Sequence, residues 1–275
     1  MLNLFVFLFG LAIGSFLNCV IYRLEKKQSF LKGRSYCPHC KHILSWQDLI
    51  PVFSFLILRG KCRYCGKKIS LQYPLVELFT GLLFVFLLNY ELGIRNYEIF
   101  NFNFIFNFLF LILNSLFLIL IFVYDLKHYI IPDKVIYPAI LLTLVFRAWD
   151  LIGHWPLGLE AKLPFQVGIL NYLLSGLGAG AFFLFIVLIS RGKWMGVGDI
   201  KLALLIGLLL GYPKALLALF LAFLIGAIIG LGLIILKKKT IKSELPFGPF
   251  LILGIYLALF FGEKIINWYL NLFSI

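Results

Sequence analysis

Long runs of apolar residues, separated by short polar segments, dominate the chain. Five runs carry no charged side chain and are close to the length that crosses about 30 Å of hydrocarbon as a helix. They are Met1–Tyr22, Ile99–Tyr124, Leu163–Ser190, Ala215–Leu236 and Leu245–Gly262. Three shorter or less uniform runs cover Leu75–Tyr90, Val135–Trp149 and Leu202–Gly211. The pattern predicts an all-α polytopic membrane protein with about eight transmembrane helices.

Composition agrees with this class, because 62% of the residues are hydrophobic and only 13% are charged. The basic residues also predict an orientation. With the N-terminus outside, the loops on the inner side cover residues 23–74, 125–134, 191–201 and 237–244, and they hold 20 of the 25 Lys and Arg residues. Basic loops stay in the cytoplasm. The net charge of +13 therefore predicts a cytoplasmic rim that contacts anionic lipid, and nucleic-acid binding is the weaker interpretation.

One polar, basic segment, residues 23–73, interrupts the membrane pattern. It contains two Cys-x-x-Cys pairs with 21 residues between them: Cys37, Cys40, Cys62 and Cys65. Four thiolates at this spacing suit a structural zinc ion, and disulfides are disfavoured on a reducing cytoplasmic face. Gly66 directly follows the second pair, where a tight turn needs positive φ. His39 and His42 are alternative ligands and are more simply read as loop residues.

We therefore divide the chain into a first transmembrane helix (1–22), a cytoplasmic four-cysteine zinc insertion (23–73) and a membrane domain (74–275). Within the insertion, the apolar stretch Leu49–Leu58 is either a small packed hairpin or an interfacial segment lying on the bilayer. The sequence leaves both interpretations open.

Asp125 and Asp199 are the main candidates for chemistry, because each stands at the edge of an apolar run on the predicted cytoplasmic side. A carboxylate at the rim of a membrane span is costly unless it is paired or faces water. Two such groups form an acid/base pair that can activate water and protonate a leaving amine. Taken singly, Asp199 also suits a helix cap and Asp125 a span terminus, while Asp133 is a competing carboxylate.

Six ordered motifs together resemble the bacterial type IV prepilin peptidase family of GxGD membrane aspartic proteases. The resemblance covers essentially the whole chain. The motifs are Gly14–Arg23, the two cysteine pairs, Tyr73–Leu78, Tyr124–Asp133, Gly196–Lys201 (GVGDIK) and Pro246–Leu251.

The resemblance implies a bifunctional enzyme of the bacterial inner membrane that acts on type IV prepilins or pseudopilins. Asp125 and Asp199 would cleave a short basic leader after a Gly at the cytoplasmic face. The enzyme would then methylate the new N-terminal residue with S-adenosylmethionine. The archaeal GxGD peptidases lack the cysteine segment and the methyl transfer, so the cysteines favour the bifunctional form.

The methyl-transfer site is harder to place, because no Gly-x-Gly-x-x-Gly turn of a soluble cofactor fold is present. Glu77 and Gly81 are the candidates, with a span-end carboxylate and a helix-packing glycine as the plain alternatives. Two other functional classes stay open from the residues alone. Rim carboxylates beside a glycine-broken helix also occur in transporters, and the cysteine segment alone would suit a non-catalytic assembly factor.

Overall fold

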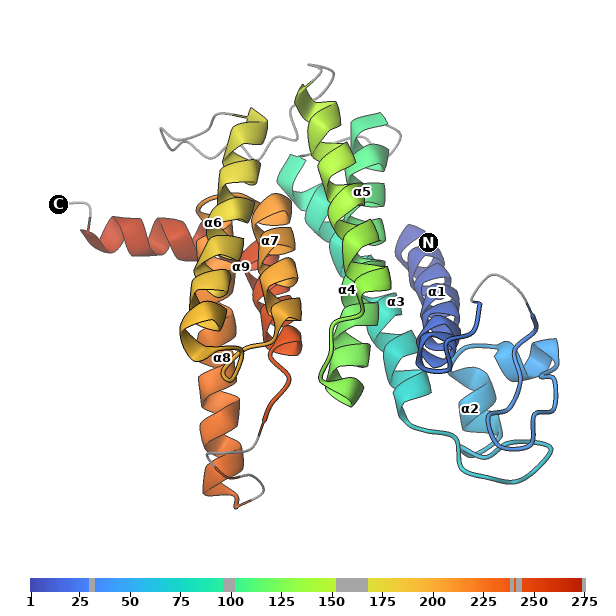
Figure 1. The fold of residues 1–275 in the computed structure, drawn as a ribbon. Helices are drawn as coiled ribbons and strands as arrows, with labels where there is room; N and C mark the ends of the chain where they lie inside the picture. Colours follow the sequence, from blue (N-terminus) through green and yellow to red (C-terminus); the bar gives the residue numbers. More distant parts are fainter. Residues whose placement is uncertain (30–32, 96–101, 152–167, 238–239, 241–243, 274–275) are drawn as a thin grey trace. The chain divides into compact units, whose positions relative to one another are not determined.

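The computed structural model describes residues 1–29, 33–95, 102–151, 168–237, 240 and 244–273 (Figure 1). No β-strand occurs in these ranges, and the helices confirm the predicted all-α class. They are α1 (Leu2–Glu25), the 3-10 helix η1 (Trp46–Leu49), α2 (Phe53–Ile57), α3 (Gln72–Arg95), α4 (Phe102–His128), α5 (Asp133–Leu151), α6 (Gly168–Ser190), α7 (Val197–Leu210), α8 (Lys214–Ile235) and α9 (Gly248–Phe273).

Six of the described helices are long and apolar enough to cross a membrane: α1, α3, α4, α6, α8 and α9. The predicted number of eight spans is therefore not confirmed, since α5 and α7 do not qualify. The first residues of the predicted runs Ile99–Tyr124 and Leu163–Ser190 lie outside the described ranges. The last predicted run ended at Gly262, whereas α9 continues to Phe273.

A contact with another helix supports the extension of α9. The carboxylate of Glu263 accepts a hydrogen bond at 2.7 Å from the ammonium group of Lys214, the first residue of α8. Lys214 is only 6% exposed, so its charge requires a partner of opposite sign. The charged residues that marked the end of the apolar run thus form an ion pair between two packed helices.

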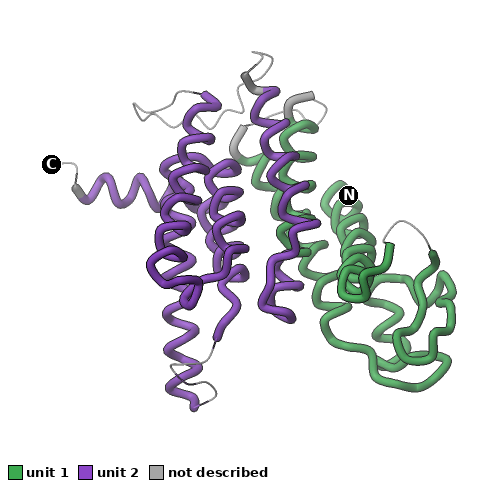
Figure 2. Tube along the Cα trace, viewed as in Figure 1, with its two compact units in different colours: residues 1–120 green, residues 121–275 purple. Residues whose placement is uncertain are grey.

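The chain forms two compact units, residues 1–120 and 121–275 (Figure 2). In the first unit α1 and α3 pack together through glycines. A Cβ added at Gly10 would lie 2.7 Å from Cα of Gly81, and one added at Gly14 would lie 2.7 Å from Cα of Glu77. Close backbone approach through small residues is how membrane helices commonly associate. The side chains of Phe84 and Leu88 on α3 are also buried and form part of the hydrophobic core of this unit.

In the second unit the short helix α7 is central, because it packs against α5, α6, α8 and α9. Gly207 allows the closest approach, since a Cβ there would overlap the carbonyl oxygen of Ser175 on α6. Four α7 side chains have 0% exposure: Leu202, Ala203, Leu205 and Ile206. After Lys201, helix α7 contains only apolar residues, which is typical of a helix enclosed by its neighbours.

The far end of α7 is held by a buried arginine. Arg147 on α5 is 3% exposed, and its Nε donates to the carbonyl oxygen of Leu208 at 3.2 Å. The guanidinium also donates to the carbonyl of Leu209 and stacks on the ring of Tyr172, with Cζ 3.6 Å from the ring centroid. The last carbonyls of a helix lack partners within the helix. Arg147 therefore satisfies the C-terminal end of α7 and ties it to α5.

Candidate active site and metal centre

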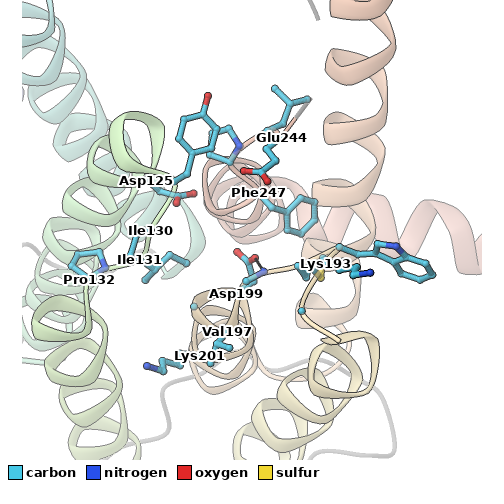
Figure 3. A pocket seen from close by; sticks show the side chains of 18 of the residues that line it. Asp125, Ile130, Ile131, Pro132, Lys193, Val197, Asp199, Lys201, Glu244 and Phe247 are labelled. Carbon is cyan, nitrogen blue, oxygen red and sulfur yellow. Dashed lines mark hydrogen bonds between the residues drawn. The ribbon is translucent and has the colours of Figure 1, made fainter. Parts of the chain in front are cut away.

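A cavity of about 730 Å³ opens at the N-terminal end of α7, within the second unit (Figure 3). Its walls come from the end of α4, the turn into α5, the α6–α7 loop, the first turn of α7 and the segment before α9. The lining residues are Asp125, Tyr129, Ile130, Ile131, Pro132, Asp133, Gly192, Lys193, Trp194, Met195, Gly196, Val197, Gly198, Asp199, Lys201, Glu244, Leu245, Pro246 and Phe247. Both candidate aspartates therefore face one cavity.

Asp125 lies in the last turn of α4, and the residue is only 4% exposed. The backbone N–H of Gly248, at the start of α9, donates to its Oδ2 at 3.1 Å. This N–H belongs to the first turn of a helix and has no partner inside that helix. The N-terminal end of α9 therefore supplies the donor that orients the Asp125 carboxylate.

Asp199 is the third residue of α7, and the residue is 9% exposed. The sequence placed it immediately before the helix, but α7 begins at Val197 and its N-cap is Gly196. The side chain turns back so that the Gly196 backbone N–H donates to Oδ2 at 3.1 Å. An acidic residue at this position is favoured by the positive end of the helix dipole. Asp199 thus caps α7 from within the first turn and also points into the cavity.

The two carboxylates are near enough to interact electrostatically. Carboxylates that share a site titrate as a pair rather than as independent groups. Such a pair can hold one proton between them, with one member accepting a proton from water and the other donating one. The arrangement therefore suits hydrolysis of a peptide bond that enters the cavity.

Asp133, the competing carboxylate, also lines the cavity but has a different environment. It begins α5, its side chain is 62% exposed, and its Oδ1 accepts a hydrogen bond from Nζ of Lys201 at 2.5 Å. Lys201 lies on α7 two residues after Asp199, and its ammonium group is 4.8 Å from the centroid of the Tyr137 ring. The Asp133–Lys201 pair connects α5 to α7 at the cavity rim.

Two glycines allow close packing around the cavity, one against Asp125 and one against Ile131. A Cβ at Gly248 would lie 2.6 Å from Oδ2 of Asp125, and a Cβ at Gly198 would lie 2.9 Å from Cβ of Ile131. The place of Gly198 beside Asp199 could be read from the sequence, but the link between Gly248 and Asp125 was missed. Gly248 and Asp125 are 123 positions apart, so no local pattern connects them. The only sign in the sequence was the presence of a glycine within the motif Pro246–Leu251.

The four predicted cysteines come together in the first unit. Their Sγ atoms all lie within 4.8 Å of one another, and the Sγ atoms of Cys37 and Cys65 are 4.0 Å apart. Tetrahedral zinc with Zn–S bonds of about 2.3 Å separates sulfurs by about 3.8 Å. The cluster therefore has the size and the donor set of a metal site. His39 and His42 are not part of the group.

The two cysteine pairs adopt the same local turn. The Lys41 N–H donates to the Cys37 carbonyl at 3.0 Å, and the Gly66 N–H donates to the Cys62 carbonyl at 2.9 Å. Gly66 has φ 68°, which confirms the predicted positive-φ turn. Lys41 occupies the equivalent position with φ 61°, although a lysine side chain disfavours that conformation.

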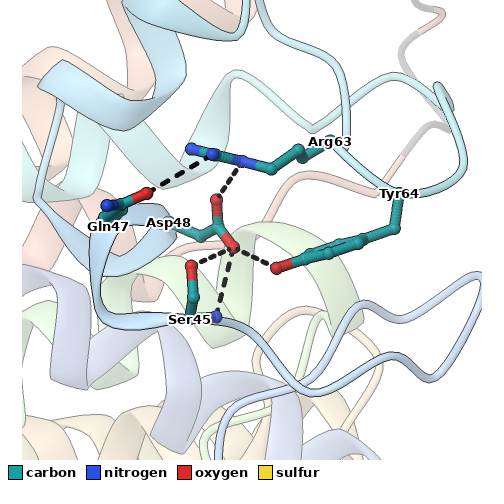
Figure 4. A network of polar contacts seen from close by, with 5 residues as sticks. All are labelled: Ser45, Gln47, Asp48, Arg63 and Tyr64. Atoms are coloured by element: carbon teal, nitrogen blue, oxygen red, sulfur yellow. Dashed lines mark hydrogen bonds and ion pairs between the residues drawn. The ribbon is translucent and has the colours of Figure 1, made fainter.

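A polar network connects the turns of the insertion (Figure 4). Asp48 accepts hydrogen bonds at Oδ2 from the Ser45 hydroxyl at 2.8 Å, the Ser45 N–H at 3.1 Å and the Tyr64 hydroxyl at 3.1 Å. Nε of Arg63 is 2.9 Å from the other oxygen. Burial raises the pKa of Asp48, but these donors outweigh burial and hold it below its usual value. Arg63 and Tyr64 lie between Cys62 and Cys65, so the network braces the second cysteine turn.

Glu77 lies on α3, is 7% exposed, and its Oε2 accepts a hydrogen bond at 2.7 Å from the backbone N–H of Val52. Val52 has φ 62°, and the Phe53 N–H donates to the Pro51 carbonyl at 2.6 Å, which is a strained three-residue turn. Gly81, one turn further along α3, faces α1, and a Cβ there would lie 2.9 Å from the ring of Phe7. The two candidates for methyl transfer therefore lie where α3 meets α2 and α1.

Comparison with known proteins agrees with this arrangement. Residues 8–90 match the Bacterial Peptidase A24 N-terminal domain, and residues 112–231 match the Type IV leader peptidase family. The Prepilin leader peptidase/N-methyltransferase of Aeromonas salmonicida (strain A449) is 32% identical over 291 residues, which cover 97% of this chain and 93% of that protein. The chain belongs to the type IV leader peptidase family.

A protein of the same name from Bacillus subtilis (strain 168) is 32% identical over 269 residues, which cover 97% of both chains. No solved structure matches the chain. Asp125 and Asp199 lie within the leader peptidase match, and the four cysteines, Glu77 and Gly81 lie within the N-terminal match. Gly248 lies beyond both, so its contact with Asp125 is visible only in three dimensions.

Replacing Asp48 with asparagine is expected to destabilise the four-cysteine insertion by about 1 kcal/mol, because an amide cannot accept all of these donors. Since folding lowers the Asp48 pKa, its contribution is present above the ordinary aspartate pKa and is lost as the pH falls through the lowered value. Competition with a zinc chelator at neutral pH measures the effect. Gln47→Ala is the control, because Gln47 contacts only the rim of the network at 3.4 Å; equal metal retention in both variants would contradict the prediction.

Replacing Gly248 with alanine is expected to lower catalytic turnover about 100-fold, because the new Cβ would displace the Asp125 carboxylate and misalign the pair. Gly232→Ala on α8 is a matched control, since a Cβ at Gly232 meets no atom within 4 Å. Steady-state cleavage of a peptide substrate, with thermal unfolding in detergent as a folding check, makes the comparison. Turnover that is equal in the two variants would show that the Gly248–Asp125 contact is dispensable.

Proposed function

We propose that this chain is a membrane endopeptidase that removes the leader of type IV prepilins or pseudopilins and then N-methylates the new N-terminus. The observation that carries the proposal is the cavity in which two buried carboxylates face each other at the ends of α4 and α7. Relatives 32% identical over nearly the whole chain carry the name prepilin leader peptidase/N-methyltransferase, which supports both activities.

In the proposed reaction one aspartate accepts a proton from water as the water attacks the carbonyl carbon of the scissile bond. The other aspartate donates its proton to the departing amine. The backbone donors at Gly196 and Gly248 keep both carboxylates aimed into the cavity. Catalysis by a positioned acid and base contributes about 100- to 10,000-fold to a rate.

The cavity also suggests how a basic leader ending in glycine is accommodated. The carboxylate of Glu244 also lines the cavity beside the aspartate pair, and its negative charge would attract a basic leader side chain (Figure 3). Asp133 lines the cavity as well, but its carboxylate is paired with Lys201. Gly196 has no side chain beside Asp199, which leaves room there for a substrate backbone, whereas Gly198 is packed against Ile131. The apolar side chains of Ile131 and Phe247 would contact the first residues of the substrate helix.

The orientation and the cofactors complete the proposal. The excess of basic residues in the loops next to this cavity supports a cytoplasmic active site in the bacterial inner membrane. Cys37, Cys40, Cys62 and Cys65 would hold a structural zinc ion, which when bound stabilises a segment too small to fold on its own core. S-adenosylmethionine is the proposed methyl donor. The proposed domain boundaries are 1–22, 23–73 and 74–275.

Asp125→Asn and Asp199→Asn are each expected to lower cleavage of a prepilin about 1,000-fold, because either change removes one member of the acid/base pair. The measurement is mass spectrometry of the product N-terminus, with the enzyme reconstituted in detergent. The wild type supplied with S-adenosylmethionine is expected to add the mass of one methyl group after cleavage.

Asp133→Asn is the matched control for this prediction, because Asp133 lines the same cavity but pairs with Lys201. It is expected to keep cleavage within about tenfold of the wild type, as is usual for a partly exposed ion pair. Near-normal cleavage by Asp125→Asn or Asp199→Asn would refute the aspartate pair. Loss of cleavage in Asp133→Asn alone would move the catalytic role to that residue.

We further propose that Glu77 and Gly81 belong to the methyl-transfer site, where Glu77 fixes the turn at Val52. Glu77→Ala is expected to reduce methylation at least tenfold and leave cleavage unchanged, because removing the acceptor leaves a strained turn unsupported. Glu77→Gln, whose side-chain oxygen can still accept the Val52 N–H, is expected to retain most of the methylation. Equal losses in both variants would show that the negative charge is needed instead of the hydrogen bond.

A further inference from the structure

The insertion that carries the cysteines exposes a set of large apolar side chains. They belong to η1, α2 and the residue after η1: Trp46, Leu49, Ile50, Phe53, Leu56 and Ile57, which we call the apolar patch. Trp46 and Ile57 are 72% and 75% exposed. Exposed apolar residues that stand singly are common on proteins, but a contiguous group marks an interaction surface.

The geometry of α2 shows that the apolar patch is a surface rather than a loosely packed core. Phe53, Leu56 and Ile57 follow the i, i+3, i+4 spacing of one helix face. Phe55 points to the other side, where its ring is 3.0 Å from the position of a Cβ on Gly60. The side of α2 that packs against the insertion is therefore occupied by Phe55, and the face with three large apolar side chains is left outside.

The hydrogen bond between Val52 and Glu77 gives the position of the apolar patch along α3. Val52 immediately precedes α2, and its N–H donates at 2.7 Å to Glu77, which belongs to the membrane span Gln72–Gly93. Glu77 is five residues inside that span, which corresponds to about 7.5 Å along the helix axis. Helix α2 lies beside this end of α3 in the first unit (Figure 1). The beginning of α2 is therefore level with the end of a transmembrane helix.

Charge favours lipid over a protein partner at this level. Arg59 and Lys61, two and four residues after the end of α2, are exposed, and residues 23–74 hold 11 Lys and Arg residues. Interfacial segments combine an apolar face with basic residues, and the apolar face enters the headgroup–acyl boundary by about 5–10 Å.

We propose that the apolar patch inserts into the headgroup–acyl boundary of the bilayer that α1 and α3 cross, with anionic lipid around its basic margin. The stretch Leu49–Leu58, which the sequence left as either a packed hairpin or an interfacial segment, is then interfacial. The four-cysteine cluster would be held against the membrane surface by this contact as well as by its two connections to the spans. The patch would insert in this way whether or not the chain has the proposed enzymatic function.

Trp46 provides a direct test in the full-length protein. The protein is reconstituted into vesicles of phosphatidylcholine and phosphatidylglycerol in which part of the phosphatidylcholine carries bromine high on its acyl chains. The fluorescence of Trp46 is taken as the difference between the wild type and Trp46→Phe. Bromine is expected to reduce the Trp46 fluorescence obtained in this way at least about twofold. Aqueous acrylamide is expected to quench it little, because the indole would lie in the interface.

Two further proteins make the result specific. The first carries Trp46→Phe together with Lys67→Trp, because Lys67 is an exposed residue next to the second cysteine turn. The tryptophan at this position is expected to be quenched by acrylamide and not by bromine. In the second, Phe53, Leu56 and Ile57 are all changed to serine. Bromine quenching of Trp46 is expected to fall towards that of the Lys67 probe, and the leucine variants Phe53→Leu and Ile57→Leu are expected to retain it.

Two outcomes would overturn the proposal. Quenching of Trp46 by acrylamide without quenching by bromine would place the apolar patch in water. Protection from both quenchers would mean that protein covers the patch, either another part of this chain or a second copy. Retained zinc in each variant, measured by chelator competition, ensures that a change in quenching does not come from an unfolded insertion.

Discussion

The candidate active site depends on the short helix α7, whose burial among four other helices aims one end of it at the cavity. An aspartate in an apolar surrounding needs donors, and those donors come from the backbone at the starts of α7 and α9. Because peptide N–H groups at helix starts are fixed by the fold, the orientation of Asp125 and Asp199 follows from helix packing. Two contacts hold α7 in position: Arg147 binds carbonyl groups at its C-terminal end, and Gly207 in its middle packs closely against α6.

Much of the fold could be predicted because apolar length is a strong signal for membrane helices. The exceptions have physical causes. Helix α7 has 14 residues and is surrounded by protein, so the hydropathy of a lipid-exposed span does not describe it. Helix α9 passes beyond Gly262 because Glu263 pairs with Lys214, and a pairing over 49 positions leaves no local trace in the sequence.

Some residues of the candidate site could likewise be predicted from the sequence, and others could not. The positions of Asp125 and Asp199 could be predicted from the edges of apolar runs, and the cysteines from their spacing, because both patterns are local. The contact of Gly248 with Asp125 could not, since glycines begin many helices without touching a catalytic group. Lys41 is a second case: its φ of 61° matches the left-handed turn at Gly66, yet a lysine gives no sign of such a turn.

The length of α7 has a consequence for where Asp199 lies. A helix of 14 residues is about 21 Å long, which is shorter than the roughly 30 Å of a hydrocarbon core. Because α7 is surrounded by other helices and does not have to cross the hydrocarbon, it can begin at the polar cavity. Its first turn then presents Asp199 to that cavity from within the packed helices, at a position that a helix long enough to span the bilayer would not need to provide.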